Sequence, residues 1–369
     1  MMDEVVEEEV DEVMEEEVEE EVGGLLLYHW SQSFASQKVR LVICEKRLAC
    51  EEREVCLPLN EHNEPWFMRL NPAGEVPVLV HGKVVVCQAD AIVTYLEETF
   101  TGDAVPRLLP EAGSPYLARV QHYRELLDSL PVDTYTHGCI LHPHLASHGS
   151  LPAFATAHIR NQIINTDAEL KKLAREHPEM RDLYLGKLRR FKSKLLEQDD
   201  LAHVERVLED LDRVLDQVET ELEQRSQESP DTEAGGELWW LCGPAYSLAD
   251  ACLVATLHRL SFLGLSRRRW GPSAQRRPRL AAYYERSARR EAFARVLRPA
   301  DNVLRSALMP AALKAARRHG PRLILRGAAA LLAGAAAAAL AVLVARVARR
   351  RLAAAVAVVV VGNVAGRAG

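Results

Sequence analysis

The sequence predicts a small mixed α/β domain, then an all-α domain, and close to the C-terminus a helix that spans a membrane. Three observations lead to this fold class. Short apolar runs with strand spacing gather before residue 105, strand patterns largely stop after residue 110, and residues 327–345 contain no charged side chain. A chain of 369 residues is long enough for two domains with their own cores plus extensions.

Strand and helix patterns alternate through the first predicted domain, residues 23–105. Their order is β-α-β-α-β-β-α, and its clearest members are LLLYHW (25–30), SQKVRLVI (36–43), EEREVCLPL (51–59) and the helical pattern over 88–99. The runs EVPVLV and KVVVC are separated by His81-Gly82, which predicts a two-residue hairpin turn.

Helical patterns dominate the second predicted domain, residues 115–300. Its segment 136–155 is rich in His, Pro and Gly and is predicted to be a loop. Apolar residues between 201 and 222 recur at alternating steps of three and four. A coiled coil and a single helix packed on a bundle both produce this stripe, and the packed helix is favoured.

Charge is distributed very unevenly along the chain. Residues 1–22 carry thirteen acidic and no basic side chains, which predicts an acidic disordered tail. From Ser266 onward, 22 Lys and Arg stand against three acidic residues. Arginine dominates that set, and no regular aromatic pattern is interleaved with it. This pattern favours an anionic lipid surface over nucleic acid, so no nucleic-acid partner is expected.

The cysteines and histidines predict neither a disulfide framework nor a metal site. Seven cysteines are an odd number without a CxxC spacing, and this usage is typical of the reducing cytosol. The histidines at 137, 142, 144 and 148 have no cysteine or carboxylate at ligand spacing, so a polar loop is expected there and no metal.

Two local motifs carry structural information. Pro77 precedes a strand, and a cis Val76-Pro77 bond would turn the backbone N–H and C=O of Val76 outward, where a bound peptide could pair with them. Ser247 and Asp250 form a predicted capping box at the start of a helix, which is a folding signal and not a catalytic one.

Several stretches together resemble the cytosolic glutathione transferase superfamily. They are NPAGEVPVL (71–79), CQADAIVTYL (87–96), WLCGPAYSLAD (240–250) and RPRLAAYYERSARREAFARVL (277–297). The resemblance implies a thioredoxin-like N-terminal domain and a helical C-terminal domain. The strings LYHWSQSFASQKVRLVI and LNEHNEPWFMRLN resemble more closely a branch of the superfamily whose members are anchored by their tails in the outer mitochondrial membrane.

The resemblance also assigns a weakened glutathione site. Ser33, Phe34 and Ala35 stand where related transferases have Ser-Ser-Cys, so Ser33 remains the weak candidate for activating a thiol and Phe34 makes the pocket more apolar. Gln88 remains at the position that holds the γ-glutamyl group, but Ala89 replaces the serine beside it. Losing one such hydrogen bond costs about 0.5–1.5 kcal/mol.

Two further features depart from the transferase pattern. Residues 145–194 are an insertion, and inserted helices of this kind are usually interaction surfaces or lids, so partner binding is expected from them. Cys87, at a strand-to-helix junction, is either a reactive or dimer-forming thiol or a small buried side chain, and the second is favoured on general grounds.

The C-terminal region predicts a membrane tail anchor. Residues 306–326 form a basic amphipathic segment interrupted by Pro310 and Pro321, residues 327–345 span the bilayer, and 346–369 form a short tail. Basic residues flank the span on both sides, at Arg322, Arg326, Arg346, Arg349, Arg350 and Arg351. Moderate apolarity with basic flanks favours mitochondria over the endoplasmic reticulum.

Two hypotheses of function follow. The resemblance implies a membrane-anchored protein of mitochondrial and peroxisomal fission, which forms a homodimer and has its main body in the cytosol. Its expected partners are outer-membrane lipid, fission machinery and cytoskeletal proteins. In this hypothesis the transferase fold is a binding module and glutathione is at most a weak ligand. The alternative is an active transferase of the outer mitochondrial membrane that acts on apolar electrophiles. The substitutions at Phe34, Ala35 and Ala89 favour the first.

Overall fold

The computed structural model describes residues 24–146, 149, 153–228, 240–271 and 276–319. The chain divides into two units, residues 1–308 and 309–369. The predicted acidic tail (1–22), membrane span (327–345) and C-terminal tail (346–369), together with all six flanking arginines, lie outside the described residues. Among the helices that are described, none is long and apolar enough to cross a bilayer.

A four-stranded sheet in the order β2-β1-β3-β4 organises the first domain. β1 (Leu25–His29) is parallel to β2 (Cys50–Glu54) and antiparallel to β3 (Val78–His81), which pairs antiparallel with β4 (Val84–Cys87). His81 pairs with Val84, so the hairpin turn is Gly82-Lys83, one residue later than predicted. Gly82 has a φ of +57°, which a glycine adopts without cost.

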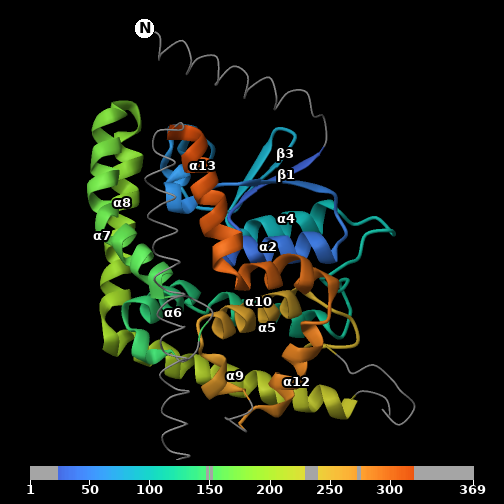
Figure 1. The fold of residues 1–369 in the computed structure, drawn as a ribbon. Coiled ribbons are helices and arrows are strands. Elements are labelled where there is room, and N and C mark those ends of the chain that lie inside the picture. Colours follow the sequence, from blue (N-terminus) through green and yellow to red (C-terminus); the bar gives the residue numbers. More distant parts are fainter. Residues whose placement is uncertain (1–23, 147–148, 150–152, 229–239, 272–275, 320–369) are drawn as a thin grey trace, which may run out of the picture. The chain divides into compact units, whose positions relative to one another are not determined.

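The two faces of the sheet enter different cores because strand side chains alternate. Leu25, Leu27 and Leu79 join the main hydrophobic cluster. α2 (Phe34–Glu45) and α4 (Ala89–Thr99) lie on this face, and α10 (Leu248–Phe262) packs against α2 from the other side (Figure 1). Tyr28 and Val78 form a smaller cluster with Phe67 of α3 (Pro65–Leu70). The predicted order β-α-β-α-β-β-α is therefore confirmed.

The helical domain is built around α10 (Leu248–Phe262), which is buried along nearly its whole length and contacts both α2 and α5. Its other helices are α5 (Leu117–Asp128), α6 (Val132–Leu141), α9 (Leu201–Glu228), α11 (Ser266–Arg269) and α12 (Pro278–Ser287). The apolar stripe of α9 is buried against neighbouring helices, among them α6, α8 and α12. The packed-helix interpretation of this stripe is confirmed.

The loop predicted over residues 136–155 is wrong at both ends, because α6 continues to Leu141 and α7 begins at Ala153. The segment is rich in His, Pro and Gly, which indicates a loop. Nevertheless Tyr135 and Cys139 are buried on one face of α6, and this burial stabilises the helix. Gly138 is needed in that helix because a Cβ at this position would approach the Val204 side chain of α9 to 2.8 Å. Close packing between the helices explains a glycine that otherwise indicates a loop.

The predicted insertion forms two helices, α7 (Ala153–Glu176) and α8 (Arg181–Asp199), which lie side by side (Figure 1). Leu170 of α7 and Tyr184 and Leu188 of α8 are buried in a cluster of their own. That cluster also contains Met68, which belongs to α3 of the α/β domain. This hairpin of α7 and α8, called the insertion hairpin below, is therefore packed against the first domain.

The predicted capping box at the start of α10 is confirmed. Asp250 accepts hydrogen bonds from the backbone N–H and the hydroxyl of Ser247, at 2.9 and 2.7 Å. It also accepts from the N–H of Leu241 and the hydroxyl of Tyr283. Burial raises the pKa of Asp250, and these four donors oppose the shift. The motif holds α10, α12 and the preceding loop together.

The second unit contains α13 (Met309–His319), which lies within the predicted amphipathic segment 306–326. Pro310 is the second residue of α13 and closely follows the π turn Leu304–Leu308, so it does not break the helix, contrary to the prediction. Pro321 lies outside the described residues. Two π turns, Phe293–Leu297 and Leu304–Leu308, precede this helix in the first unit.

Candidate functional site

The residues predicted to hold a thiol peptide come together at one edge of the sheet. Tyr28 pairs with Val78, and Val78 pairs with Cys87, so the end of β1, the start of β3 and the end of β4 are neighbours. Ser33 follows β1, Val76-Pro77 precedes β3 and Gln88 follows β4. The Val76-Pro77 bond is cis, as the sequence predicted.

Ser33 is the N-cap of α2, and its side-chain oxygen accepts from the N–H of Ser36 at 3.3 Å. This bond uses the hydroxyl oxygen as an acceptor and leaves its proton free to be donated. Phe34, the next residue, begins α2 and packs against the main hydrophobic cluster. The predicted donor is thus retained in a position that also stabilises a helix.

Gln88 has an unusual backbone for a residue with a side chain, with φ +71° and ψ 134°. It is the N-cap of α4, and its carbonyl accepts from the N–H of Ile92 at 3.0 Å. Backbone strain of this kind costs about 1–3 kcal/mol and is found most often at functional sites. Ala89, the first residue of α4, supplies no hydroxyl beside it.

Cys87 is half-buried at the end of β4, which is an edge strand of the sheet. Burial raises the pKa of its thiol, so the neutral form dominates at physiological pH. A thiol in this form reacts slowly with electrophiles. The edge position is compatible with a contact to a second chain, and both interpretations of Cys87 stay open.

A cavity of about 290 Å³ lies next to this edge, between the α/β domain and the helical domain. Its walls come from the β1–α2 loop, the segment 57–63, helices α6, α7, α8 and α10, and residues 303–308. Most lining side chains are apolar, including Trp30, Phe191 and Phe262. The predicted residues Ser33, Val76, Pro77 and Gln88 are not among those that line it.

Lys187 of α8 fastens the insertion hairpin to the α/β domain. Its ammonium group donates to Asn63 Oδ1 at 2.5 Å, to the Gly74 carbonyl at 2.7 Å and to the His62 carbonyl at 3.4 Å. Gly74 lies two residues before Val76, so the hairpin holds the loop that leads into the cis bond. The acceptors are uncharged, and burial lowers the pKa of Lys187 to about 7, with Glu75 opposing the shift.

Two neutral hydrogen bonds reinforce this contact. The Tyr184 hydroxyl of α8 donates to the Asn63 carbonyl at 2.8 Å, and Gln162 of α7 donates to the Pro58 carbonyl at 3.0 Å. The loop between β2 and α3 is therefore held by both helices of the insertion hairpin.

The β1–α2 loop is held from the opposite side by α10 and by residues 300–306. Gln32 donates to the Ala300 carbonyl at 2.7 Å and to Ser306 Oγ at 2.8 Å. Arg259 of α10 donates to the Gln32 carbonyl at 2.6 Å. Sequence reasoning missed Lys187 and Arg259, because single cations in a polar segment or a buried helix give no local signal.

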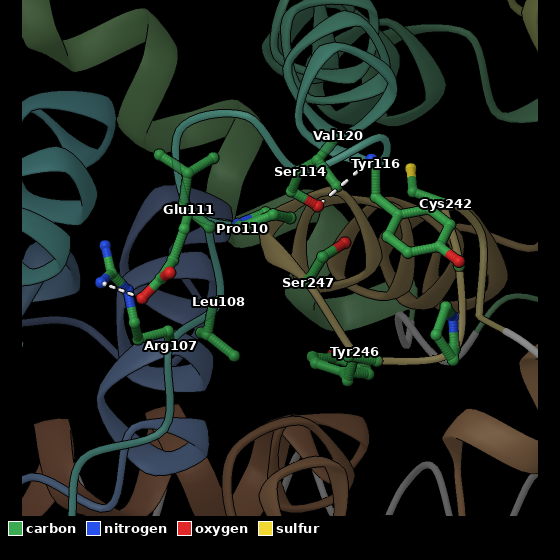
Figure 2. A pocket seen from close by; sticks show the side chains of 14 residues that line it. Arg107, Leu108, Pro110, Glu111, Ser114, Tyr116, Val120, Cys242, Tyr246 and Ser247 are labelled. Atoms are coloured by element: carbon green, nitrogen blue, oxygen red, sulfur yellow. Dashed lines mark hydrogen bonds and ion pairs between the residues drawn. The ribbon is translucent and has the colours of Figure 1, made fainter. Parts of the chain in front are cut away.

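A second hollow, of about 400 Å³, lies where the linker between the domains meets the start of α10 (Figure 2). Figure 2 shows the ion pair of Arg107 and Glu111 on one side of it and Tyr116 on the other. Burial raises the pKa of the Cys242 thiol at its rim. Its polar groups serve the linker and the capping box, so it is the weaker candidate.

The predicted histidine cluster is spread over several elements. His137 lies on α6 with Nδ1 3.1 Å from the Asp133 carbonyl, and His142 Nε2 is 3.1 Å from the Asp199 carbonyl. His148 lies outside the described residues. Within the described ranges, no group of three potential ligands could hold a metal ion.

The chain matches two domain families in the expected order. Residues 27–104 match the glutathione S-transferase N-terminal domain, and residues 202–286 match the glutathione S-transferase C-terminal domain. The insertion hairpin falls in the stretch between the two matches.

Ganglioside-induced differentiation-associated protein 1-like 1 of Mus musculus is 51% identical over 301 residues, and the human protein of that name is 50% identical over 298. Each alignment covers 80% of this chain and 80% of the relative. This chain belongs to the family of ganglioside-induced differentiation-associated protein 1. Family membership extends over both domains and the insertion hairpin.

Solved structures agree on the fold. Ure2p in complex with glutathione aligns with a TM-score of 0.53 at 17% identity, over 78% of this chain and 98% of that one. Glutathione transferase F7 of Populus trichocarpa aligns with a TM-score of 0.50 at 21% identity, over 74% and 97%. Identities this low show the shared fold alone.

The half-buried Lys187 predicts a pH-dependent stability. Its folded pKa of about 7 is below its ordinary value, so the unfolded chain binds more protons between pH 7 and 10.5 and stability rises with pH there. Against a Lys187→Met variant, the unaltered chain should gain stability by up to about 1.4 kcal/mol per pH unit in that window.

Denaturant unfolding of both proteins at pH 7, 8 and 9 measures this difference. Arg189→Met, on the same helix with an exposed side chain, serves as the control and should show no such trend. A stability difference between the Lys187→Met and unaltered chains that does not change with pH would contradict the account of Lys187.

Proposed function

We propose that the protein is a membrane-anchored member of its family that regulates mitochondrial fission and network dynamics and uses the transferase fold as a binding module. The observation that carries this proposal is the attachment of the insertion hairpin. Lys187 donates to the Gly74 carbonyl, two residues before the cis Val76-Pro77 bond, and Tyr184 donates to the Asn63 carbonyl. The insertion hairpin is thereby fixed to the loop that leads into the predicted glutathione edge.

The composition of the glutathione edge supports the same proposal. Ala89 has replaced the hydroxyl next to Gln88, and Ala35 follows Ser33 and Phe34 at the start of α2. Gln88 keeps its strained backbone, so the architecture of the edge is retained. In this proposal glutathione is a weak ligand and the protein holds no tightly bound cofactor. The main role of the domain is to bind partners or ligands, and not to catalyse a reaction of glutathione.

The tail supports membrane attachment. Residues 327–345 contain no charge and are flanked by arginines on both sides. We place the anchor in the outer mitochondrial membrane, with the main body facing the cytosol and the peroxisomal membrane as a second destination. Outer-membrane lipid, a second copy of the chain, fission machinery and cytoskeletal proteins are the proposed partners. Cys87 on the edge strand β4 is the proposed site of contact between two copies.

A second candidate function is an active transferase of the outer mitochondrial membrane. The proton of the Ser33 hydroxyl favours it, since that proton is available to stabilise a thiolate. The apolar cavity beside the sheet edge would suit an apolar electrophile. The binding-module function predicts weak glutathione binding and slow turnover, whereas the transferase predicts tight binding and fast turnover.

Restoring the missing hydroxyl tests the weakened site. Ala89→Ser should raise glutathione affinity by up to roughly tenfold, because one hydrogen bond is worth about 0.5–1.5 kcal/mol. Ala91→Ser, two residues along α4 at an exposed position, is the matched control and should change nothing. Calorimetry measures both variants. Low-micromolar binding and brisk turnover by the unaltered chain would instead support the transferase.

Removing the predicted anchor tests the membrane assignment. A chain that ends at residue 319 should appear in the soluble fraction of cells, because it lacks the uncharged run 327–345. Fractionation and fluorescence imaging beside the full chain measure this. Mitochondrial attachment of the shortened chain would show that targeting resides in the described domains.

A further inference from the structure

The cavity of about 290 Å³ contains a buried cation that the fold has not neutralised. Arg259 of α10 lines this cavity and is 5% exposed. Its Nη2 donates to the Gln32 carbonyl and, at 3.3 Å, to Gln37 Oε1, which are both neutral acceptors. Among the described residues no carboxylate forms an ion pair with it. Asp133 acts on Arg259 only from a distance, and Lys194 lies 3.6 Å from that carboxylate.

One edge of the Arg259 guanidinium still has a donor to offer. Its Nε is buried and has no hydrogen-bond partner in the described part of the chain. Leaving a buried charged donor unpaired costs more than an ordinary unmade hydrogen bond. Burial accordingly lowers the pKa of Arg259 to about 10, with Asp133 opposing the shift. An anion placed at Nε would remove this cost.

Lys187 adds positive charge to the same cavity without offering another donor. Three oxygens, Asn63 Oδ1 and the carbonyls of Gly74 and His62, accept from its ammonium group. Because its pKa is about 7, its charge favours an anion below about pH 7, while the hydrogen bond to that anion comes from Arg259. The unpaired Nε–H offers one charge-assisted hydrogen bond, which one oxygen of a carboxylate can accept.

The aromatic side chains that line the cavity indicate the chemistry of the rest of the ligand. Trp30, Phe191 and Phe262 line the cavity, and the Arg259 guanidinium lies over the Phe262 ring at 5.4 Å. Aromatic side chains prefer stacked or edge-on contacts with flat rings. A volume of about 290 Å³ is at the small end of the range for small-molecule sites, so the ligand is compact.

We propose that this cavity binds a compact aromatic monocarboxylate, with the carboxylate on Arg259 and the ring among Trp30, Phe191 and Phe262. Residues of α7 and α8 line part of this site, so it exists in this form only in a chain that carries the insertion hairpin. The inference rests on the proposed binding-module function, because it names the class of ligand that the module takes.

Calorimetric titration of the full chain in detergent tests it, after subtraction of an empty-micelle titration. The probes are 2-naphthoate and its neutral counterpart 2-naphthamide. The acid should bind roughly ten- to a hundredfold more tightly than the amide, as expected for a charge-assisted hydrogen bond in a buried site. Equal affinities for the two probes, or no binding of the acid, would overturn the proposal.

Variants locate the site. Arg259→Gln should reduce the preference for the acid to within about twofold, whereas Arg268→Gln, the same charge change at an exposed position, should keep it. Since Arg259 also holds the Gln32 carbonyl, a second variant leaves it intact: Ile163→Trp on α7 fills the cavity and should abolish binding of both probes. Unchanged binding by Ile163→Trp, or a preference that persists in a folded Arg259→Gln, would contradict the assignment.

Different results would contradict the proposed function and the proposed ligand class. Tight glutathione binding in a parallel titration would contradict the binding-module function and leave the naphthoate result standing. Failure to bind naphthoate would overturn the ligand class, while weak glutathione binding and membrane attachment would remain as proposed.

Discussion

The ammonium group of Lys187 joins parts of the chain that are far apart in sequence. It comes from the insertion hairpin and binds oxygens of His62, Asn63 and Gly74, which belong to two loops of the α/β domain. A Cβ on Gly74 would meet Lys187 Nζ at 2.3 Å, and φ at Gly74 is +61°, so the loop is shaped for this contact. The arrangement of the sheet edge, the cavity and the insertion all depend on this attachment.

The protein keeps the frame of a glutathione transferase, and the insertion hairpin is attached to that frame. The cis Val76-Pro77 bond and the strained Gln88 are retained at the sheet edge. Beside them, α7 and α8 supply walls to a cavity that also includes the buried Arg259. Under the proposed binding-module function, a ligand in this cavity contacts the insertion hairpin as well as the transferase frame.

Local sequence patterns were sufficient to predict much of the fold. Strand alternation predicted β1 to β4, and Pro77, Ser247 and Asp250 predicted a cis bond and a capping box that the structure contains. The α6 helix was missed because its His and Gly content outweighed the apolar spacing of Tyr135 and Cys139. The roles of Lys187 and Arg259 could not be predicted, since burial of a single cation is decided by contacts over more than a hundred residues.

Hydrogen exchange of backbone amides in residues 57–75 tests the central claim, that the insertion hairpin holds these loops through Lys187. In the full chain with Lys187→Met, exchange in this segment should accelerate at least about tenfold, since the loss of a buried charged donor frees its three acceptors. Amides of β1 and β3 should exchange as before, and Arg189→Met should match the unaltered chain. Unchanged exchange over 57–75 in Lys187→Met would contradict the account.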